Sequence, residues 1–269
     1  MWIWKADSAK AVIVIVHGAG EHHGRYKWLR SQWISKGYHV VMGDLPGQGS
    51  TRRKRGHIES FDEYIEVIES WVIQARQTDL PVFLFGHSMG GLAVIRVLTE
   101  KNLPVKAVLL SSPCLGIINK PSKAVDTVAK VLNKVYPSLL LNADQGLGNG
   151  TRSEEMIKRD IEDKLLVKKV SVRWYRELVS AIKLAHRTTE RFPDIPLVLV
   201  QAGNDLIVDK WKVREWFNKL PLIEKSYKEW PDLYHEVLNE PERDQVFQYL
   251  NHFLERFILE EGVQTIRER

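Results

Sequence analysis

Residues 86–90 read GHSMG, between the apolar run LPVFLF at 80–85 and the helix-like stretch GLAVIRVL at 91–98. A strand, a sharp turn and a helix in this order place the turn serine on a strained elbow, with its hydroxyl above the sheet. Glycine is needed on both sides because the strand and helix backbones approach closely there, without room for a Cβ atom. The first helical turn also directs free N–H groups at this point. Ser88 is therefore the predicted nucleophile; the alternative is a glycine-rich turn with a capping serine.

The other two members of a catalytic triad are expected after the serine, first an acid and then a histidine. The buried strand predicted at 195–201 ends shortly before Asp205, and functional groups of parallel sheets gather beyond the carboxyl ends of strands. Asp209 is the rival acid, but it precedes a helix-like stretch and suits a helix cap better. His235 comes later, on a loop after the strand-like 225–230, and is the predicted general base.

A third loop follows the apolar run AVIVIV at 11–16, which is typical of a strand buried on both faces. It reads HGAGEH at 17–22, and a His-Gly-x-Gly loop after such a strand supplies a backbone N–H to an oxyanion hole. The predicted donors are the backbone amides of Ala19 and Met89. The histidine pair at 22–23 raises the alternative of a metal site, but no third ligand lies at helical or finger-like spacing. Neither a metal nor a cofactor is predicted.

Taken together, these blocks resemble the monoacylglycerol lipases and related lysophospholipases of the serine α/β-hydrolase superfamily, in particular those of bacillus type. The resemblance runs over about residues 11–257. Its segments are HGAGEH at 17–22, GRY at 24–26, DLPGQGS at 44–50, RGHIESF at 55–61, GHSMGG at 86–91, AGNDLIVD at 202–209 and HEVLNE at 235–240. Gln48 departs from the family, which commonly has histidine there. The resemblance implies an α/β-hydrolase fold and cleavage of an ester between one long acyl chain and a small polar alcohol.

Length and composition agree with one hydrolase domain. The 269 residues are 44% hydrophobic and 27% charged, which is ordinary for a globular protein with a single core. The single cysteine, Cys114, excludes an intrachain disulfide and suits a reducing compartment. No secretory signal is visible, and no segment approaches the roughly 18–20 apolar residues of a membrane span. These features predict a cytoplasmic protein.

A mild excess of positive charge gives a formal net charge of +5. The densest basic run is RRKR at 52–55, which is either a solvated loop or a patch that attracts an anionic phospholipid or a fatty-acid product. No zinc-finger, RNA-binding or helix-turn-helix signature accompanies the run, so no nucleic-acid partner is expected.

Apolar strands alternate with helical stretches, which predicts a mostly parallel sheet with helices on both faces. The predicted strands are 11–16, 38–43, 81–85, 105–111, 195–201 and 225–230, and the predicted helices are 26–36, 61–77, 89–101, 172–191, 210–219 and 240–259. Any strand at 2–4 is expected to be a short edge. Asp62 is the expected cap of the second helix.

The alternation breaks after Cys114 and resumes near 172, and an insertion of this length in a compact domain is usually functional. We expect a hydrolase core of residues 1–114 and 172–269, with a helical cap of residues 115–171 over the active site. The cap is expected to include a charged helix from Ser153 to about Lys169. Its apolar residues either line an acyl tunnel, contact lipid, or pack the cap onto the core: Val128, Val131, Leu132, Val135, Leu139, Leu140 and Leu141. A phosphate loop in the glycine-rich stretch 145–150 is not expected, because no buried strand precedes it.

The predicted reaction is hydrolysis of a carboxylic ester through an acyl-Ser88 intermediate, with His235 as base and Asp205 orienting it. The resemblance implies a lipid ester as substrate, monoacylglycerol first and lysophospholipid second, with peptidase activity a weaker third. Transient contact of the cap with a membrane surface is also expected. Two further classes are an acyltransferase and a non-catalytic lipid-binding relative, and the presence of all three triad residues argues against the latter.

Overall fold

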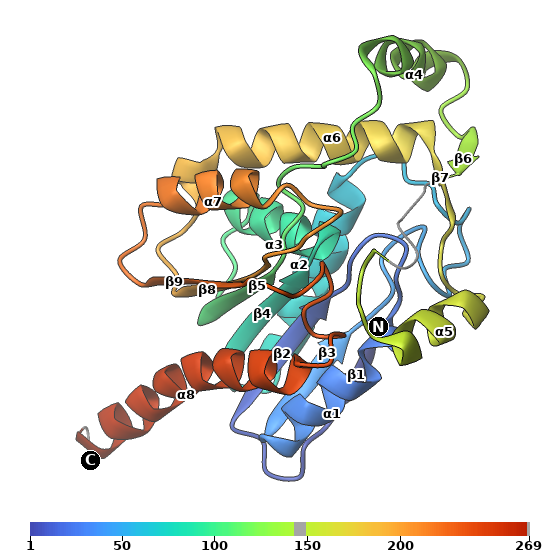
Figure 1. Cartoon of the computed structure of the whole chain (residues 1–269). Coiled ribbons are helices and arrows are strands. Elements are labelled where there is room, and N and C mark those ends of the chain that lie inside the picture. Colours follow the sequence, from blue (N-terminus) through green and yellow to red (C-terminus); the bar gives the residue numbers. More distant parts are fainter. Residues whose placement is uncertain (143–148, 268–269) are drawn as a thin grey trace.

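A seven-stranded sheet lies at the centre of the described chain, with strand order β1-β3-β2-β4-β5-β8-β9 (Figure 1). The computed structural model describes residues 1–142 and 149–267. The strands are β1 (Trp2–Trp4), β2 (Ala11–Val16), β3 (Tyr38–Met42), β4 (Val82–His87), β5 (Ala107–Ser111), β8 (Leu197–Ala202) and β9 (Lys225–Trp230). All neighbouring pairs are parallel except β1, which pairs with β3 in antiparallel register. The predicted mostly parallel sheet, with residues 2–4 as its short edge, is confirmed.

Helices cover both faces of this sheet (Figure 1). One face is covered by α1 (Lys27–Ser35) and α8 (Arg243–Arg267); the other is covered by α2 (Asp62–Arg76), α3 (Met89–Glu100), α6 (Val172–Arg187) and α7 (Lys210–Lys219). Along β2, Ile13 and Ile15 pack on the α1 and α8 side, whereas Val12, Val14 and Val16 pack on the opposite side. This strand is apolar throughout because each of its faces lies against a helical layer.

The start of α2 differs from the expectation. Asp62 does not cap the helix but lies in its first turn, and its own N–H donates to Ser60 Oγ at 3.2 Å. The N–H of Glu63 donates to Ser60 O at 3.2 Å, so Ser60 rather than Asp62 accepts the first two free amides of the helix.

The insertion between β5 and α6 contains α4 (Lys123–Val135), β6 (Leu140–Asn142), α5 (Glu154–Glu162) and β7 (Lys169–Ser171). The strands β6 and β7 form a small antiparallel ribbon that the sequence did not predict, because three residues are too few to show an alternating pattern. The charged helix is also shorter than expected. It begins after Ser153, whose hydroxyl accepts from the Met156 N–H, and ends at Glu162. Most of the glycine-rich stretch 145–150 lies outside the described residues.

The basic run is exposed at residues 52–54 and half-buried at Arg55, and three of its side chains have protein partners. Arg53 forms an ion pair with Glu63 of α2. Lys54 Nζ donates to Ser138 O at 2.7 Å, and Arg55 Nη1 donates to Lys164 O at 2.9 Å. Lys54 and Arg55 therefore fasten two separate parts of the insertion to the core, a role that neither interpretation of the sequence included.

Among the residues that the structure describes, no helix is both long and apolar enough to span a bilayer.

Candidate active site

Ser88 stands on a strained turn between β4 and α3. Its φ of 51° and ψ of −120° lie in a region that residues with a side chain rarely adopt, at a typical cost of about 1–3 kcal/mol. Glycine neighbours permit this turn, because a Cβ atom on Gly90 would lie 2.3 Å from Val16 O and one on Gly86 would lie 2.7 Å from Gly90 O. The close backbone approach expected from the sequence is therefore present.

The three side chains predicted to form a triad meet at this turn. Ser88, Asp205 and His235 follow the carboxyl ends of β4, β8 and β9. The Ser88 hydroxyl donates to His235 Nε2 at 2.8 Å, and His235 Nδ1–H donates to Asp205 Oδ2 at 2.8 Å. All three residues are buried. The arrangement lets the imidazole accept a proton from the serine on one side while the carboxylate holds its other nitrogen.

The Asp205 carboxylate is fixed by donors besides His235. Its Oδ1 accepts the N–H groups of Ile207 at 2.9 Å and Val208 at 2.8 Å, and its Oδ2 accepts from Gln201 Nε2 at 3.1 Å. Burial alone would raise the pKa of Asp205, but His235 and these donors hold the pKa below its ordinary value. Gln201 was missed in the sequence, although a polar residue inside the apolar run of β8 was a visible signal.

Asp209, the other candidate for the triad acid, has a different role. Asp209 is the N-cap of α7, where its side chain accepts the N–H groups of Trp211 at 3.1 Å and Lys212 at 3.4 Å. The capping role expected for it is confirmed, and Asp205 is the acid that contacts His235.

Two buried histidines flank Ser88, and their environments differ. Burial would lower the pKa of His235, but the charge and hydrogen bond of Asp205 raise the pKa above its ordinary value. For His87, whose ring centroid lies 4.9 Å from that of His235, burial is the largest cause and lowers the pKa. His87 Nδ1 lies 3.1 Å from Ser111 O, so this ring is held as a neutral donor. Of the two, His235 is the histidine whose ring nitrogen lies within hydrogen-bond distance of the Ser88 hydroxyl.

The two predicted oxyanion donors both border the same cavity as Ser88. The N–H groups of Gly18 and Gly20 are occupied, by Glu21 Oε2 at 2.6 Å and Gln48 Oε1 at 2.9 Å. The amide of Ala19 lies between them and has no acceptor among the described residues. The amide of Met89 is the first of α3 and has no intrahelical acceptor. Gln48, which departs from the family pattern, therefore helps to hold the loop that carries Ala19.

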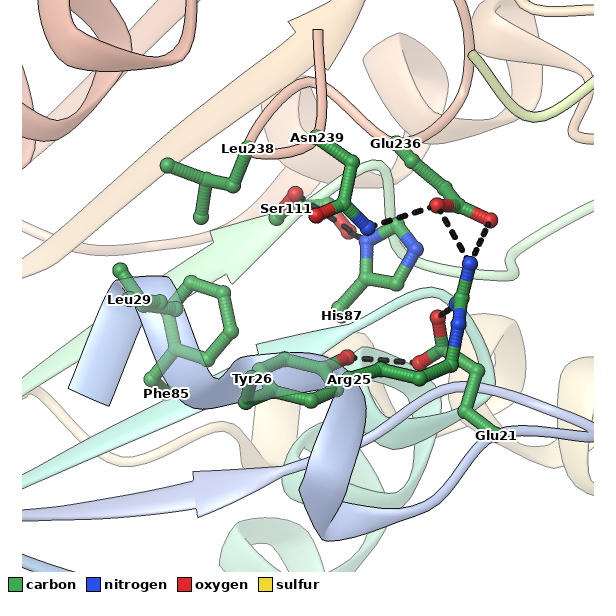
Figure 2. A pocket seen from close by; sticks show the side chains of 10 residues that line it. All are labelled: Glu21, Arg25, Tyr26, Leu29, Phe85, His87, Ser111, Glu236, Leu238 and Asn239. Carbon is green, nitrogen blue, oxygen red and sulfur yellow. Dashed lines mark hydrogen bonds and ion pairs between the residues drawn. The ribbon is translucent and has the colours of Figure 1, made fainter. Parts of the chain in front are cut away.

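A buried ionic cluster lies beside this loop, with Arg25 at its centre (Figure 2). Arg25 pairs with Glu21, with Asp160 of α5, and with Glu236 at 3.0 Å. Burial would raise the pKa of Glu21, but Arg25 lowers that pKa to about 2. Tyr26 OH donates to the same carboxylate at 2.6 Å. Four of these residues lie in three of the sequence blocks, 17–22, 24–26 and 235–240, and nothing in the sequence shows that these blocks meet.

The histidine pair at 22–23 is used in protein contacts. His22 Nε2 lies 2.8 Å from Asp163, and His23 Nδ1 lies 2.8 Å from Asp44. Within residues 1–142 and 149–267, no group of three or more His, Cys, Asp or Glu side chains is arranged to hold a metal ion.

Above Ser88 lies a cavity of about 560 Å³, within the range of about 300–1,000 Å³ typical of small-ligand pockets. Its apolar walls are formed by Cys114, Ile117, Val125, Ala129, Leu141, Ile157, Leu166, Val167, Val170, Val172, Trp174, Tyr175, Leu178 and Ile207. Of the cap residues considered from the sequence, Leu141 lines the cavity, whereas Val128, Val131 and Val135 are exposed. Burial raises the pKa of the Cys114 thiol to about 12.

A mostly parallel sheet, with a serine elbow after one strand and a histidine and an aspartate after two others, defines an α/β-hydrolase. Residues 7–242 match the family described as serine aminopeptidase, S33, and the chain belongs to this family.

Comparison with individual relatives indicates which class of reaction this family member catalyses. The phospholipase YtpA of Bacillus subtilis is 53% identical, over 96% of this chain and the whole of that protein. Human monoglyceride lipase is 30% identical, over 92% of this chain and 84% of its own length. The crystal structure of Paleococcus ferrophilus monoacylglycerol lipase superposes with a TM-score of 0.85 at 30% identity, covering 96% and 98% of the two chains. These likenesses place the protein among the carboxylic ester hydrolases.

Proposed function

We propose that this enzyme hydrolyses esters of a single acyl chain, with Ser88 as nucleophile, His235 as general base and Asp205 as the residue that orients His235. The observation that carries the proposal is the hydrogen-bonded series Ser88–His235–Asp205 at the wall of an apolar cavity. An acyl chain can lie in this cavity with its carbonyl carbon next to Ser88 Oγ.

In the proposed reaction, Ser88 Oγ attacks the ester carbonyl and its proton passes to His235 Nε2. Asp205 stabilises the resulting imidazolium, which then protonates the departing alcohol. The amides of Ala19 and Met89 bind the oxyanion, and loss of one such donor typically costs about 3–4 kcal/mol of transition-state stabilisation. Water activated by His235 then cleaves the acyl-Ser88 ester and restores the hydroxyl.

Monoacylglycerol is the substrate that the charges around the cavity favour. Three carboxylates, those of Glu21, Asp160 and Glu236, surround Arg25, and Lys168 also lines the cavity, so carboxylates outnumber cations by three to two. A surplus of negative charge suits the neutral hydroxyl groups of glycerol and opposes a phosphate. The relatives named monoglyceride lipase agree with this choice.

A lysophospholipid is the second candidate. It is favoured by the 53% identity to a protein named phospholipase, which extends over the full length of that protein.

Turnover of matched substrates tests both candidates. Wild type and Ser88→Ala are compared on 1-monoacylglycerol and lysophosphatidylglycerol with the same acyl chain, in series of short, medium and long chains. We expect a higher kcat/KM for monoacylglycerol, and a loss of several orders of magnitude in Ser88→Ala with unchanged folding. A higher kcat/KM for the lysophospholipid would reassign the head group, and full activity in Ser88→Ala would reject the mechanism. Turnover that requires an added alcohol acceptor would indicate an acyltransferase instead.

We further propose that residues 115–171 form the cap of a core made by 1–114 and 172–269, and that the cap touches lipid surfaces through α4. This helix has no buried residue and lies outermost, above α6 (Figure 1). Val125 and Ala129 of α4 border the cavity, while Val128, Val131 and Val135 are more than half exposed. An apolar helix face next to a lipid pocket, with lysines at 123, 130 and 134, suits the surface of an anionic bilayer.

Vesicle binding tests the role of α4. Val128→Asp is expected to weaken co-sedimentation with phosphatidylglycerol vesicles and to leave hydrolysis of a soluble short-chain ester unchanged. The matched control is Ile223→Asp, because Ile223 is 91% exposed but lies between α7 and β9, outside the cap. Equal binding of the two variants would reject α4 as the contact. The single cysteine supports a reducing, cytoplasmic location for this proposed encounter.

A further inference from the structure

The second half of the cap is tied to the loop that carries Ala19, which we define as the oxyanion loop, residues 17–26. Asp160 of α5 binds Arg25 with both carboxylate oxygens, one to Nη2 and one to Nε at 3.3 Å. Asp163, which follows α5, lies 2.8 Å from His22 Nε2. In the next turn of chain, the Val167 N–H donates to Gly20 O at 2.9 Å. Three separate contacts thus join one segment of the cap to one loop of the core.

Arg25 also pairs with Glu21 and Glu236, and its guanidinium lies between these two carboxylates (Figure 2). It pairs with Glu21, and the other oxygen of Glu21 accepts the Gly18 N–H at 2.6 Å, directly before Ala19. It also pairs with Glu236, the residue after His235, at 3.0 Å. Asp160 therefore reaches the backbone next to Ala19 through two ion pairs, Asp160–Arg25 and Arg25–Glu21. It reaches Glu236, the neighbour of the proposed general base, through Asp160–Arg25 and Arg25–Glu236.

The cluster is sensitive to the loss of one member because it is buried. The Arg25 side chain is only 3% exposed, and that of Asp160 is 11% exposed. Removing one partner of a buried ion pair is strongly destabilising because it leaves an uncompensated charge, so loss of the Asp160 charge is expected to change how Arg25 pairs with Glu21 and Glu236. Asp160 also accepts from its neighbour Arg159 at 3.0 Å, so the carboxylate itself is held in place from the α5 side.

We propose that Asp160 is a positioning residue for the reaction: through Arg25 and Glu21 it sets the place of the Ala19 amide, so that the cap governs stabilisation of the transition state as well as access of the substrate. The inference rests on the proposed oxyanion role of Ala19. It assigns to a cap residue an effect on kcat that a lid acting only on entry does not have.

The test uses p-nitrophenyl butyrate, a soluble ester that contains no glycerol and fills little of the acyl cavity. For Asp160→Asn we expect kcat to fall by about tenfold with KM within about twofold, since loss of a whole oxyanion donor costs about 10²–10³ in kcat and the loop keeps its other contacts. The matched control is Glu155→Gln, which removes the same charge from an exposed position on the same helix. It is expected to behave as wild type.

A second readout separates positioning from stability. Phosphonylation of Ser88 by a p-nitrophenyl alkylphosphonate also places an oxygen among the oxyanion donors, and its rate is expected to fall by a similar factor in Asp160→Asn. Wild-type kcat and phosphonylation rate in a variant with a lowered Tm would overturn the proposal, because Asp160 would then only stabilise the cap. A change confined to KM for monoacylglycerol would also overturn it, because Asp160 would then bind glycerol.

Two further variants, Asp163→Asn and Ser88→Ala, complete the test of Asp160. Asp163→Asn loosens a second of the three contacts at a half-buried position, and a smaller fall in kcat on p-nitrophenyl butyrate is expected there. If Asp160→Asn does not fold, this variant decides: an unchanged kcat would overturn the proposal. Ser88→Ala is measured alongside, because activity that persists in it would show failure of the proposed function itself rather than of the role of Asp160.

Discussion

Replacing Asp205 with asparagine and Asp209 with asparagine should have opposite consequences, although the two carboxylates are only four residues apart. At position 205 the amide oxygen can still accept the N–H groups of Ile207 and Val208. The amide NH₂ must then face His235 Nδ1, which has to present a lone pair and carry its proton on Nε2. That nitrogen can no longer accept the proton of Ser88.

The expected loss follows from this wrong tautomer. An asparagine in the place of a triad aspartate lowers kcat by about 10⁴, which corresponds to about 5.5 kcal/mol. Gln201 offers no rescue by rotation, because its Nε2 also donates to Ala202 O at 3.1 Å. The acid limb of the residual activity should move to lower pH, since Asp205 is what raises the pKa of His235.

Asp209→Asn is the matched control. Asparagine caps a helix about as well as aspartate, so the free energy of unfolding should change by only a few tenths of a kcal/mol and kcat should not change. The assay is steady-state hydrolysis of p-nitrophenyl butyrate from pH 5 to 9, with thermal melts of both variants. A loss of less than about a hundredfold in Asp205→Asn, or a comparable loss in Asp209→Asn, would refute the tautomer argument.

Three further predictions concern other parts of the molecule. In wild type, activity needs neutral His235 and the pKa of His235 is raised, so kcat/KM for a neutral ester should rise with pH with an apparent pKa above 6.5; a lower midpoint would contradict the raised value. Gly90→Ala places a Cβ atom 2.3 Å from Val16 O and should destabilise the fold by about 3 kcal/mol or more, measured by urea unfolding; a loss below about 1 kcal/mol would show that the elbow can relax. Replacing Lys54 with methionine should change the unfolding free energy by less than about 1 kcal/mol, because Lys54 is exposed, but should accelerate proteolytic cleavage within 115–171; an equal cleavage rate would show that the contact with Ser138 does not hold this segment.

The sheet and the candidate triad could be predicted because their signals are local. The run at 11–16 is apolar at every position because both faces of the strand are buried. The turn at 86–90 has glycine at positions 86 and 90 because the backbones approach too closely for a Cβ atom. The order of Ser88, Asp205 and His235 then follows from the order of the strands that precede them.

What could not be predicted depends on contacts between distant segments. Arg25 and Asp160 are 135 residues apart, and nothing in the sequence around either shows that they pair. The sequence around Lys54 also fits a solvated lysine, because a hydrogen bond to the Ser138 carbonyl does not require any particular residue type at position 138. The capping role given to Asp62 was wrong for a local reason, because the helix begins at Asp62 itself and the N–H of Asp62 donates to Ser60 Oγ.

The separation of 147 residues between Ser88 and His235 has a consequence for how the enzyme matures. His235, the proposed base, follows β9, which is the last strand in the described chain and pairs with β8 at the edge of the sheet. Such long-range pairing is slow compared with helix formation. A chain in which β9 has not yet docked therefore lacks the imidazole that contacts the Ser88 hydroxyl. In a refolding experiment, the return of esterase activity would time the last docking step rather than the collapse of the core.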